Sequence, residues 1–537
     1  MQKDRFSRKF FLSTVISCLG ILGLGSFFKF RKPEITGSIL GPNKELGHKI
    51  REPFSPPSIL NKTKKAKVII AGAGISGLAT GYYLSKSGFQ DYLILELETE
   101  AGGNSKFGNR NGFKFPWGAH YLPQPNSETV LVRKLLEDFG LVIGKDPKGN
   151  PIYSEKILCF DPEERIFYQG RWQSGLVPRR TGEPDKQELK FRSLMDFWRT
   201  KVGRDGRKAF AIPMELSSRD PEILSLDKIS FREYLENQKI NSEELLWYAD
   251  YCMRDDYGGS LSTISAWAGI HYFSSRNVDE TGEDPAVITW PEGNGFLMEK
   301  LKELSKDRIQ TSSLVRKIRK SGSSWEVFGF NGSTSKEFAF ESEYLVYALP
   351  SFTRRYILSE NQDYLKNLTY SPWLVANLFV NKLPLGKGHA PAWDNVIYKS
   401  PSLGYIISTH QDLRAQRPQS VLTYYLAFGG EDTLTSKQKM MRMSWRDWKK
   451  EILVDLKRPH PNIENLVFQM DIMTHAHAMI RPTPGFLWGG KREKLSQTSE
   501  GVIFAHSDLS GFSLFEEALY RGHEAARKIL QKLNIHS

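Results

Sequence analysis

The pattern of hydrophobic and polar positions divides the chain into an apolar leader, an irregular tether and a long globular body. Residues 1–9 are basic, and residues 10–28 then run without a single charge. This order is typical of a secretory signal and is long enough to border on a membrane span, so residues 1–30 are interpreted as a signal or membrane-anchor segment. Residues 31–63 contain five prolines and no apolar periodicity, which predicts a flexible tether.

The globular body opens with a strand–turn–helix–strand pattern. Lys67-Val68-Ile69-Ile70 is a short β-branched run typical of a buried parallel strand. A helix is expected over Ile75–Lys86, with Gly88 ending it, and a second strand over Tyr92–Leu95. The fold is therefore predicted to start near residue 64 with a βαβ unit.

The turn after the first strand carries a glycine-rich nucleotide-binding motif, whose members are Gly72, Gly74, Ile75, Ser76 and Gly77. The first glycine permits the tight turn, the second lets the backbone approach a pyrophosphate, and the third lets the helix pack against the strand. Glu96 ends the second strand, 24 residues after the first glycine, where an acid binds ribose hydroxyls and disfavours a 2′-phosphate. The pattern predicts a bound dinucleotide.

Composition and charge limit the number of domains and the kinds of ligand that the chain is expected to have. With 537 residues, 40% of them hydrophobic, the chain is expected to form at least two domains. The net charge of +13 invites a nucleic-acid interpretation, but residues 1–67 carry a surplus of ten, which leaves only +3 for the other 470 residues. A nearly neutral body does not offer a basic groove, so we expect no nucleic-acid binding.

Three cysteines without a CxxC pair exclude a disulfide framework and a structural zinc site. Cys159 and Cys252 are expected to be unpaired buried thiols, with one bridge between them as the alternative. Cys18 follows a stretch that resembles a bacterial lipobox, but the apolar run continues to Leu24, so an ordinary small residue in an apolar segment is the favoured interpretation. Residues 7–12 resemble a twin-arginine export signal with Lys at the second position.

The residues after Glu96 identify the cofactor through a resemblance. Gly102-Gly103 resembles the second flavin contact of the flavin-containing amine oxidase and phytoene desaturase superfamily, which implies FAD rather than NAD. Asn104 stands where that family usually has Arg. Further segments match in family order, and the resemblance implies cofactor contacts from Gly118, Ala119, Val315, Ala348, His506, and Ser507 or Asp508.

The resemblance implies an α/β fold with two interleaved parts. A doubly wound, Rossmann-like FAD-binding domain is assembled from discontinuous segments, which are 64–121, 286–350 and 471–537. An α+β substrate domain is inserted between them, from residues 122–285 and 351–470. The terminal helix, expected over 513–530, would direct its N-terminus toward the flavin.

Departures from the family pattern bear on the chemistry. Asn377 falls where many amine oxidases have a lysine, which favours a dehydrogenase or desaturase over a fast oxidase. The chain has no cysteine after Cys252, so FAD should be non-covalent, and it has no second dinucleotide motif. His120 is a candidate proton acceptor or flavin contact, with a structural histidine as the alternative.

Three other histidines are candidates for the site, each with an alternative interpretation. His475 and His477 alternate as on a strand and so share one face, where they either border the cavity or ligate a metal; we expect no metal. His506 could contact flavin or cap its strand. The aromatic run from Asp256 to Phe273 could line a pocket or form core.

The sequence therefore predicts an exported FAD-dependent oxidoreductase that acts on a small-molecule substrate. Hydride would pass from a substrate C–N or C–C unit to flavin N5, and an external acceptor (oxygen, a quinone or a protein) would reoxidise the flavin. The protein would be periplasmic, either exported across the bacterial inner membrane or anchored to it by its N-terminal segment. The alternatives are a desaturase or isomerase of a lipid-like polyene and a non-catalytic flavin-binding protein.

Overall fold

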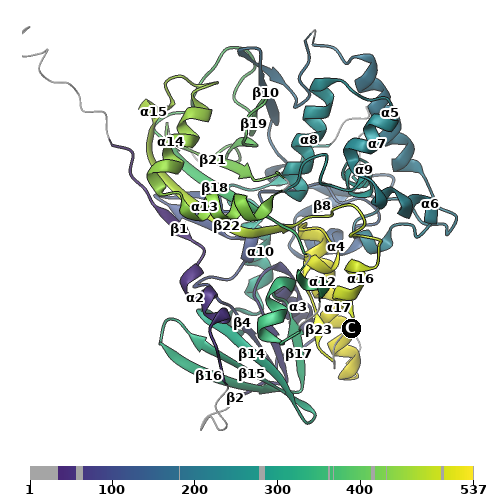
Figure 1. The fold of residues 1–537 in the computed structure, drawn as a ribbon, viewed down its shortest axis with the longest axis vertical. Helices are drawn as coiled ribbons and strands as arrows, with labels where there is room; N and C mark the ends of the chain where they lie inside the picture. The colour runs from purple at the N-terminus through teal and green to yellow at the C-terminus, as the bar shows by residue number, and fades with distance from the viewer. Residues whose placement is uncertain are drawn as a thin grey trace, which may run out of the picture.

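A computed structural model describes most of the chain, namely residues 34–55, 64–180, 182–276, 285–360, 363–366, 368–412, 418–430, 432–497 and 501–535. Two bodies are visible in Figure 1: a parallel-sheet domain in the lower half and a larger sheet with helices in the upper half. Strands that are distant in sequence pair within each sheet, so the chain passes several times from one body to the other.

The lower body is built on a five-stranded sheet in which every pair is parallel. Its strands, in spatial order, are β13 (Ile309–Gln310), β4 (Tyr92–Leu95), β3 (Val68–Ala71), β17 (Tyr344–Tyr347) and β23 (Ile503–Phe504). Helix α3 covers Ile75–Lys86, as predicted. The strand expected over residues 67–70 is shifted by one residue, because β3 begins at Val68 and ends at Ala71.

The two faces of this sheet are covered differently. Helices α3, α10 (Gly295–Glu303) and α17 (Phe515–Lys532) pack on one face with Val68 and Ile70. An antiparallel sheet covers the other face, made of β14 (Ser313–Ser321), β15 (Ser324–Asn331) and β16 (Lys336–Ser342), with β2 (Lys64–Lys65) at its edge. The predicted α/β fold is confirmed, but the second face carries strands where a doubly wound domain would have helices.

The upper body contains an eight-stranded sheet. Its strands, in spatial order, are β1 (Ile39–Gly41), β22 (Val467–Ile480), β18 (Tyr370–Val380), β21 (Ser420–Ala427), β20 (Gly404–Ile407), β19 (Asp394–Ile397), β10 (Glu164–Tyr168) and β11 (Arg171–Ser174). Strand β18 is buried along its whole length. Leu374 and Leu378 pack toward one apolar cluster and Val375 and Phe379 toward another, as the period of two requires.

Helices complete both sides of this sheet. The cluster containing Leu374 and Leu378 also holds residues of α13 (Thr433–Arg442) and α14 (Trp445–Leu456). Four further helices lie at the upper right of Figure 1: α5 (Lys186–Thr200), α7 (Phe231–Asn237), α8 (Glu243–Tyr257) and α9 (Ala266–Ser274). The remaining α-helices are α2 (Lys44–His48), α4 (Val130–Asp138), α6 (Pro221–Leu224), α11 (Arg354–Ile357), α12 (Asp363–Lys366), α15 (Ile463–Leu466) and α16 (Lys491–Ser496).

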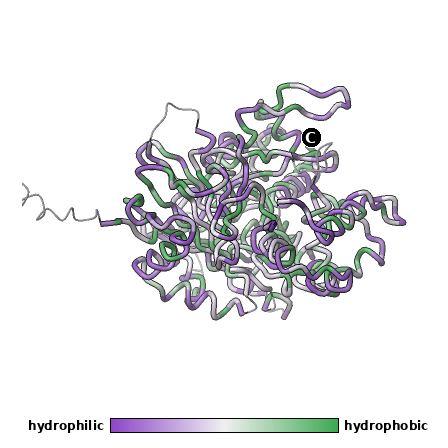
Figure 2. The backbone as a smooth tube through the Cα atoms, turned by 90° about the horizontal axis from the view of Figure 1, so that it is seen from above, coloured by the Kyte–Doolittle hydropathy of each residue, from purple (hydrophilic) through white to green (hydrophobic). Residues whose placement is uncertain are grey.

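Short strands connect these parts: β5 (Phe107–Arg110), β6 (Phe113–Pro116), β7 (Tyr121–Leu122), β8 (Val142–Lys145), β9 (Pro151–Tyr153) and β12 (Ile288–Thr289). Figure 2 shows hydrophobic and hydrophilic segments alternating throughout the body. Among the described residues, no helix is both long and apolar enough to cross a membrane. The apolar run at 10–28 and Cys18 lie outside the described residues.

The structure corrects the prediction of a flexible tether for residues 34–55. Strand β1 pairs in parallel with β22, and Asn43 caps α2 by accepting a hydrogen bond from the amide of Leu46. Gly37 permits this contact, because a Cβ there would lie 1.8 Å from the carbonyl oxygen of Met470. Periodicity could not reveal so short a strand, since its partner lies more than 400 residues away.

Two predicted domain boundaries also differ from the structure. Leu122, Leu135 and Ile157 pack in the core of the lower body, so the inserted domain begins after Ile157 rather than at residue 122. Strand β22 continues to Ile480, so residues 471–480 belong to the eight-stranded sheet and not to the C-terminal FAD-binding segment. Cys159 and Cys252 are free and buried, as expected.

Candidate functional site

The glycine-rich turn joins β3 to α3 with the geometry that the motif predicts. Gly72 has a φ of +103°, and a Cβ there would lie 2.8 Å from the carbonyl oxygen of Ala348. A Cβ at Gly77 would lie 1.9 Å from the carbonyl oxygen of Gly72, so only glycine allows this close approach of helix and strand. At Gly74 a Cβ would meet nothing within 4 Å, so the backbone is open to a ligand there.

The first turn of α3, which contains Ile75 and Ser76, presents amide groups without intrahelical acceptors. Such amides and the positive end of the helix dipole favour a phosphate. Helix α17 packs on this turn at Gly522, where a Cβ would lie 2.4 Å from the carbonyl oxygen of Ser76. The C-terminal helix therefore supports the position of the turn from behind.

Glu96 lies at the end of β4 with only 8% of its surface exposed. Its carboxylate accepts hydrogen bonds of 2.9 Å from the amides of Ala73 and Glu98. Burial raises the pKa of Glu96, whereas the two amide hydrogen bonds and Lys106 act in the opposite direction. Each carboxylate oxygen keeps capacity for another hydrogen bond, so the group can accept from ribose hydroxyls.

The glycine pair meets the first glycine-rich turn. The amide of Gly102 donates to the carbonyl oxygen of Ala73 at 2.8 Å. Gly103 has a φ of +56°, and a Cβ there would lie 3.2 Å from the Cα of Gly74. The two glycine-rich segments thus converge where the pyrophosphate of a dinucleotide is expected.

Asn104 is uncharged and therefore cannot provide the ionic contact of the arginine that the family usually has at this position. Its side-chain amide donates to the carbonyl oxygen of Ala478 on β22 at 2.7 Å. The backbone carbonyl oxygen of Asn104 accepts from the amide of Ala119 at 3.0 Å, and a Cβ at Gly118 would lie 2.2 Å from it. Asn104 therefore links the glycine pair to residues 118–119 and to the upper sheet.

Val315 and Ala348 lie on strands beside this turn. Ala348 follows β17, and its amide donates to the carbonyl oxygen of Ala71 at 2.8 Å. Val315 is buried in β14, whose first residue, Ser313, donates its amide to the carbonyl oxygen of Glu96. Together with the glycines and Glu96, these positions form a cradle that fits the adenosine diphosphate part of FAD.

His120 belongs to an aromatic group at the boundary with the upper body. Its ring stacks on Tyr425 with centroids 4.5 Å apart and lies 5.5 Å from Trp393. The Tyr425 hydroxyl donates to the carbonyl oxygen of Gly118 at 3.0 Å. Burial lowers the pKa of His120 to about 4, so the imidazole is neutral at physiological pH and is a weak base.

A group of carboxylates adjoins these rings. The Tyr121 hydroxyl donates to Asp256 at 3.2 Å and to Asp255 at 3.4 Å, and Tyr251 donates to Asp394 at 3.2 Å. Burial raises the pKa of Asp394 to about 7. Burial and the neighbouring Asp256 and Asp394 raise the pKa of Asp255 well above its ordinary value.

The three acids are not equivalent. Asp256 forms an ion pair with Arg276, which supplies a counter-charge. Asp255 and Asp394 form no ion pair with a described residue, and both side chains are only half-buried. These two acids are therefore the carboxylates that a cationic ligand could neutralise.

Asn377 is fully buried on β18, and both ends of its side-chain amide are engaged. It donates to the carbonyl oxygen of Pro116 at 3.2 Å and accepts from the Thr423 hydroxyl at 2.6 Å. Ser408 extends this chain by a further hydrogen bond with Thr423. The arrangement favours a positioning role for the segment that leads to His120, rather than contact with a substrate.

His475 and His477 lie on β22 beside different partners. His475 Nε2 lies 3.0 Å from the carbonyl oxygen of Trp117, and His477 stacks on Phe352 at 4.2 Å. Burial lowers their pKa values to about 4 and about 3, so both rings are neutral. Among the described residues, no three His, Cys, Asp or Glu side chains form a group that could hold a metal.

The segment 506–508 follows β23 and faces inward. His506 accepts a hydrogen bond from the amide of Asp508, which caps a short turn, and Ser507 is buried beside it. Asp508 accepts from the Tyr370 hydroxyl at 2.5 Å and from the amide of Ser351 at 2.8 Å. Burial would raise the pKa of Asp508, but His506 and these hydrogen bonds hold it below its ordinary value.

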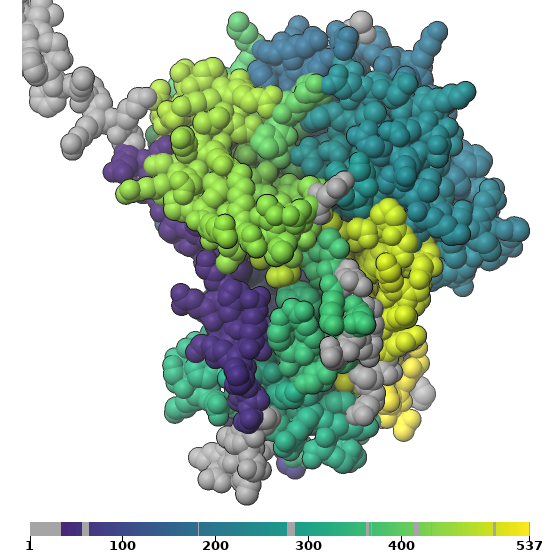
Figure 3. All heavy atoms as spheres, in the orientation of Figure 1, coloured from purple at the N-terminus to yellow at the C-terminus, as the bar shows by residue number. Residues whose placement is uncertain are grey.

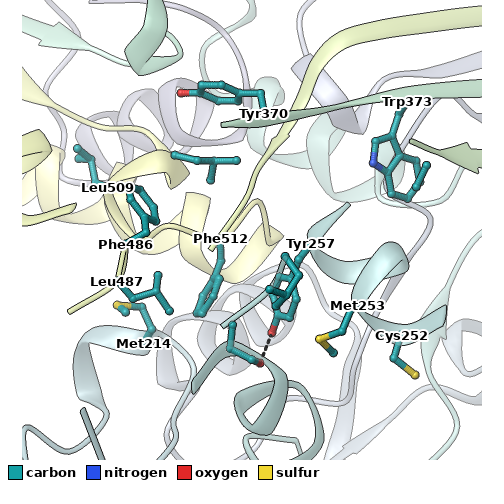
Figure 4. Close-up of a cluster of buried hydrophobic side chains, with 14 of the residues drawn as sticks. Met214, Cys252, Met253, Tyr257, Tyr370, Trp373, Phe486, Leu487, Leu509 and Phe512 are labelled. Carbon is teal, nitrogen blue, oxygen red and sulfur yellow. Dashed lines mark hydrogen bonds between the residues drawn. The ribbon is translucent and has the colours of Figure 1, made fainter. Parts of the chain in front are cut away.

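The aromatic run between Asp256 and Phe273 is mainly core. Tyr257 and Trp267 are fully buried, and the Tyr257 hydroxyl donates to the carbonyl oxygen of Ala268. Figure 4 shows Tyr257 beside Phe512, among side chains from α8, β18 and the C-terminal segment. The core interpretation of this run is therefore the one that the structure favours.

The structure brings the predicted cofactor residues Gly72, Gly74, Gly77, Glu96, Gly102, Gly103 and Ala348 together around one turn, with His120 at the border of the upper body. The predicted contacts His506, Ser507 and Asp508 lie after β23 and have other partners. The structure also separates Asn377 and Asp508 from any open surface. The sequence pattern did not reveal the roles of Asp255, Asp394, Trp393 and Tyr425. One signal was available: Asp255 and Asp256 end helix α8, where negative charge opposes the helix dipole.

Comparisons with known proteins agree with this architecture. A family model described as an NAD(P)-binding Rossmann-like domain matches residues 70–139. Polyamine oxidase 7 of Oryza sativa subsp. japonica is 32% identical over 114 residues, which are 19% of this chain and 23% of that protein. Flavin-containing amine oxidase B of Sus scrofa is 23% identical over 312 residues, which are 54% of this chain and 51% of that protein.

Solved structures share the fold over nearly the whole chain. A triple mutant of putrescine oxidase superposes with a TM-score of 0.64 at 15% identity, covering 88% of this chain and 100% of that one. A fatty acid isomerase from P. acnes that produces CLA superposes with a TM-score of 0.58 at 16% identity, covering 87% and 98%. The sequence matches span between 10% and 51% of the length of the curated relatives, whereas the fold match to putrescine oxidase covers 88% of this chain. The chain is therefore similar in sequence to flavin-containing amine oxidases over part of its length, and it shares the fold of putrescine oxidase over nearly all of it.

Proposed function

We propose that this chain is an FAD-dependent oxidoreductase that takes hydride from the C–N unit of a small amine. The observation that supports this proposal is that residues 118–121 contact the cofactor site at one end and a group of carboxylates at the other. Gly118 and Ala119 contact the dinucleotide cradle through Asn104, and two residues later Tyr121 donates to Asp255 and Asp256. One short segment thus connects the cofactor site to a carboxylate group.

Two carboxylates that form no ion pair with a described residue favour a cationic substrate. An ammonium group beside Asp255 and Asp394 would be attracted electrostatically, and the rings of His120, Tyr425 and Trp393 would border its carbon chain. FAD, when bound, supplies N5 as the hydride acceptor. The amine must lose a proton before hydride leaves, and a carboxylate whose pKa lies near neutrality can hold that proton.

The neutral histidines are weaker candidates for this proton. The pKa of His120 is about 4 because burial disfavours the imidazolium, so His120 would hold a proton poorly at neutral pH. We assign His120 to the wall of the substrate site and the proton to Asp255 or Asp394. FAD is proposed to be non-covalent, since the sequence has no cysteine after Cys252.

The experiment uses the purified full chain reconstituted with FAD and mixed anaerobically with candidate substrates. Putrescine, cyclohexylamine and L-amino acids represent C–N substrates, and linoleic acid and retinol represent lipids. An amine is expected to bleach the visible flavin absorbance. Release of all flavin by denaturation would support non-covalent binding.

Substitutions sharpen this test. Asp255→Asn and Asp394→Asn are each expected to slow anaerobic reduction at least tenfold while FAD stays bound, whereas Glu236→Gln on the exposed face of α7 should leave the rate unchanged. A protein that takes up no flavin would refute the cofactor assignment. Flavin that no amine reduces would refute the substrate assignment.

The second candidate is a lipid desaturase or isomerase. The similarity to the fatty acid isomerase and the engaged amide of Asn377 favour it, because no lysine stands at that position. It predicts a change in linoleic acid or a polyene and no response to amines. Bound FAD without any reaction would favour a non-catalytic flavoprotein.

The cellular setting is also proposed from the leader sequence. The basic and apolar order of residues 1–28 supports export across, or anchoring to, a bacterial inner membrane, with the body in the periplasm. An external acceptor (oxygen, a quinone or a redox protein) would reoxidise the flavin. Fractionation of cells that produce the full chain, followed by detection in membrane and periplasmic fractions, tests this placement.

A further inference from the structure

The positive charge of the globular body is concentrated on one helix pair. Residues 433–458, which contain α13 and α14, hold eight Lys or Arg and only three Asp or Glu, a surplus of five. The whole body after residue 67 has a net charge of only +3, so without this pair it would be slightly negative. This local surplus of positive charge requires an explanation that is specific to the helix pair.

Much of this charge is not neutralised by neighbouring side chains. Lys439 pairs with Glu451 at 3.5 Å, and Lys457 pairs with Glu464 at 2.6 Å. Arg442, Arg446 and Lys450 are exposed and form no ion pair with any described residue. Their long stems can lie along an apolar surface while the charged heads remain in a polar layer.

Apolar side chains are exposed on the same two helices. Leu434 is 64% exposed, Val454 59% and Met441 37%. Between the helices lies an open groove of about 980 Å³. Its lining includes basic and apolar residues, among them Lys439, Arg442, Met443, Lys450 and Val454, and also the acids Asp447, Glu451 and Asp455. Basic residues interspersed with exposed aliphatic ones are typical of surfaces that lie in the interface of an anionic membrane.

The N-terminal segment is tied to this same part of the molecule. Ile35 packs in one apolar cluster with Trp448, Ile452 and Ile463. The first described residues run alongside α14 and α15 in Figures 1 and 3. Five residues, 29–33, separate the apolar run at 10–28 from residue 34, so the distance between residues 28 and 34 is at most about 20 Å.

We propose that the α13–α14 surface docks on an anionic lipid bilayer, with the basic side chains against the headgroups and Leu434, Met441 and Val454 in the interface. A bilayer that holds the 10–28 segment would lie within reach of this surface. Docking would set the orientation of the body relative to the membrane. The proposal does not depend on which substrate the flavin oxidises.

The test places a fluorophore on the surface of the full chain. Val454→Cys is labelled with an environment-sensitive dye in a Cys18→Ser background, since Cys159 and Cys252 are buried. The protein is mixed with, or reconstituted into, phosphatidylcholine vesicles with or without 30% phosphatidylglycerol. A blue shift is expected only with phosphatidylglycerol, and added salt should reverse it.

Two matched sets of charge-reversal substitutions test whether the basic residues of the α13–α14 surface cause the association with vesicles. Lys439→Glu/Arg442→Glu/Lys450→Glu should weaken the association about tenfold or more. Lys145→Glu/Lys156→Glu/Lys186→Glu changes the net charge equally, at exposed sites on other elements, and should alter the association less than about twofold. The melting temperature and FAD absorbance report whether each variant is folded.

Three results would overturn the proposal. The first is a dye at residue 454 that does not respond to phosphatidylglycerol. The second is an equal loss of association in both triple variants. The third is a response to a DNA duplex instead of vesicles, which would assign the surface to nucleic acid.

Discussion

At the scale of single residues, three carboxylates show how the surroundings of an acid set its properties. Glu96 and Asp508 are buried and Asp394 is half-buried, and each has different hydrogen-bond partners. Glu96 accepts from two backbone amides, Asp394 from one tyrosine hydroxyl, and Asp508 from an amide and a hydroxyl beside His506. Two predictions concern such groups.

Glu96→Gln is expected to weaken FAD binding by roughly tenfold to a hundredfold, because a hydrogen bond to a charged acceptor contributes about 1.5–3 kcal/mol. Isothermal titration of the apoprotein with FAD measures the effect. Glu100→Gln, which changes an exposed acid four residues away, should leave the dissociation constant unchanged. Equal affinities for Glu96→Gln and the unmodified protein would contradict the ribose-binding role.

Asp394→Asn is expected to make the protein less sensitive to pH. The folded-state pKa of Asp394 is raised to about 7 from 3.8, so the folded state holds a proton that the unfolded state has released between about pH 4 and pH 7. This group therefore lowers stability as the pH rises through that window. The melting temperature of the Asn variant relative to the unmodified protein should increase from pH 5 to pH 8, and a constant difference would contradict the assignment.

At the scale of elements, close packing of α17 on α3 supports the cofactor turn. Helix α17 reaches α3 only because Gly522 lacks a side chain. Gly522→Ala would place a methyl group 2.4 Å from the carbonyl oxygen of Ser76, so the helices must separate. We expect a loss of about 2 kcal/mol or more in unfolding free energy, together with weaker FAD binding.

Chemical denaturation and FAD titration measure these two effects. Gly144→Ala provides the control, since a Cβ there would meet only the end of the Ile152 side chain at 3.9 Å. A Gly522→Ala protein as stable as the control would show that the two helices can shift without cost.

At the scale of the whole molecule, Asp508 joins three parts that are far apart in sequence. It follows β23, accepts from the amide of Ser351 after β17, and accepts from Tyr370 at the start of β18 in the eight-stranded sheet. The domains are therefore connected through one buried carboxylate that lies next to the proposed flavin contacts.

Asp508→Asn is expected to cost about 2–4 kcal/mol of stability at pH 7, because a buried charge-assisted network loses its acceptor. The folded-state pKa of Asp508 is lowered, so its contribution is present above pH 3.8 and is lost as the pH falls. The cost of the variant, measured by denaturation, should shrink toward acidic pH. Tyr370→Phe should cost only about 1 kcal/mol, and a larger loss there would shift the role from Asp508 to Tyr370.

The sequence by itself determined the first βαβ unit, including the bounds of α3, the roles of Gly72, Gly74 and Gly77, and the position of Glu96. Local signals suffice for these features, because a strand, a turn and a helix that follow one another pack within about 30 residues. The order of family-like segments also predicted the α/β class and its discontinuous construction.

Only the tertiary structure decided the remaining features. Strand β1 pairs with β22, and Asp255 meets Asp394 and Tyr121 across segments more than a hundred residues apart. It likewise showed that the amide of Asn377 is already engaged by Pro116 and Thr423. Periodicity reports which face of an element is buried, but not which residues it meets there, because that choice depends on the packing of the whole chain.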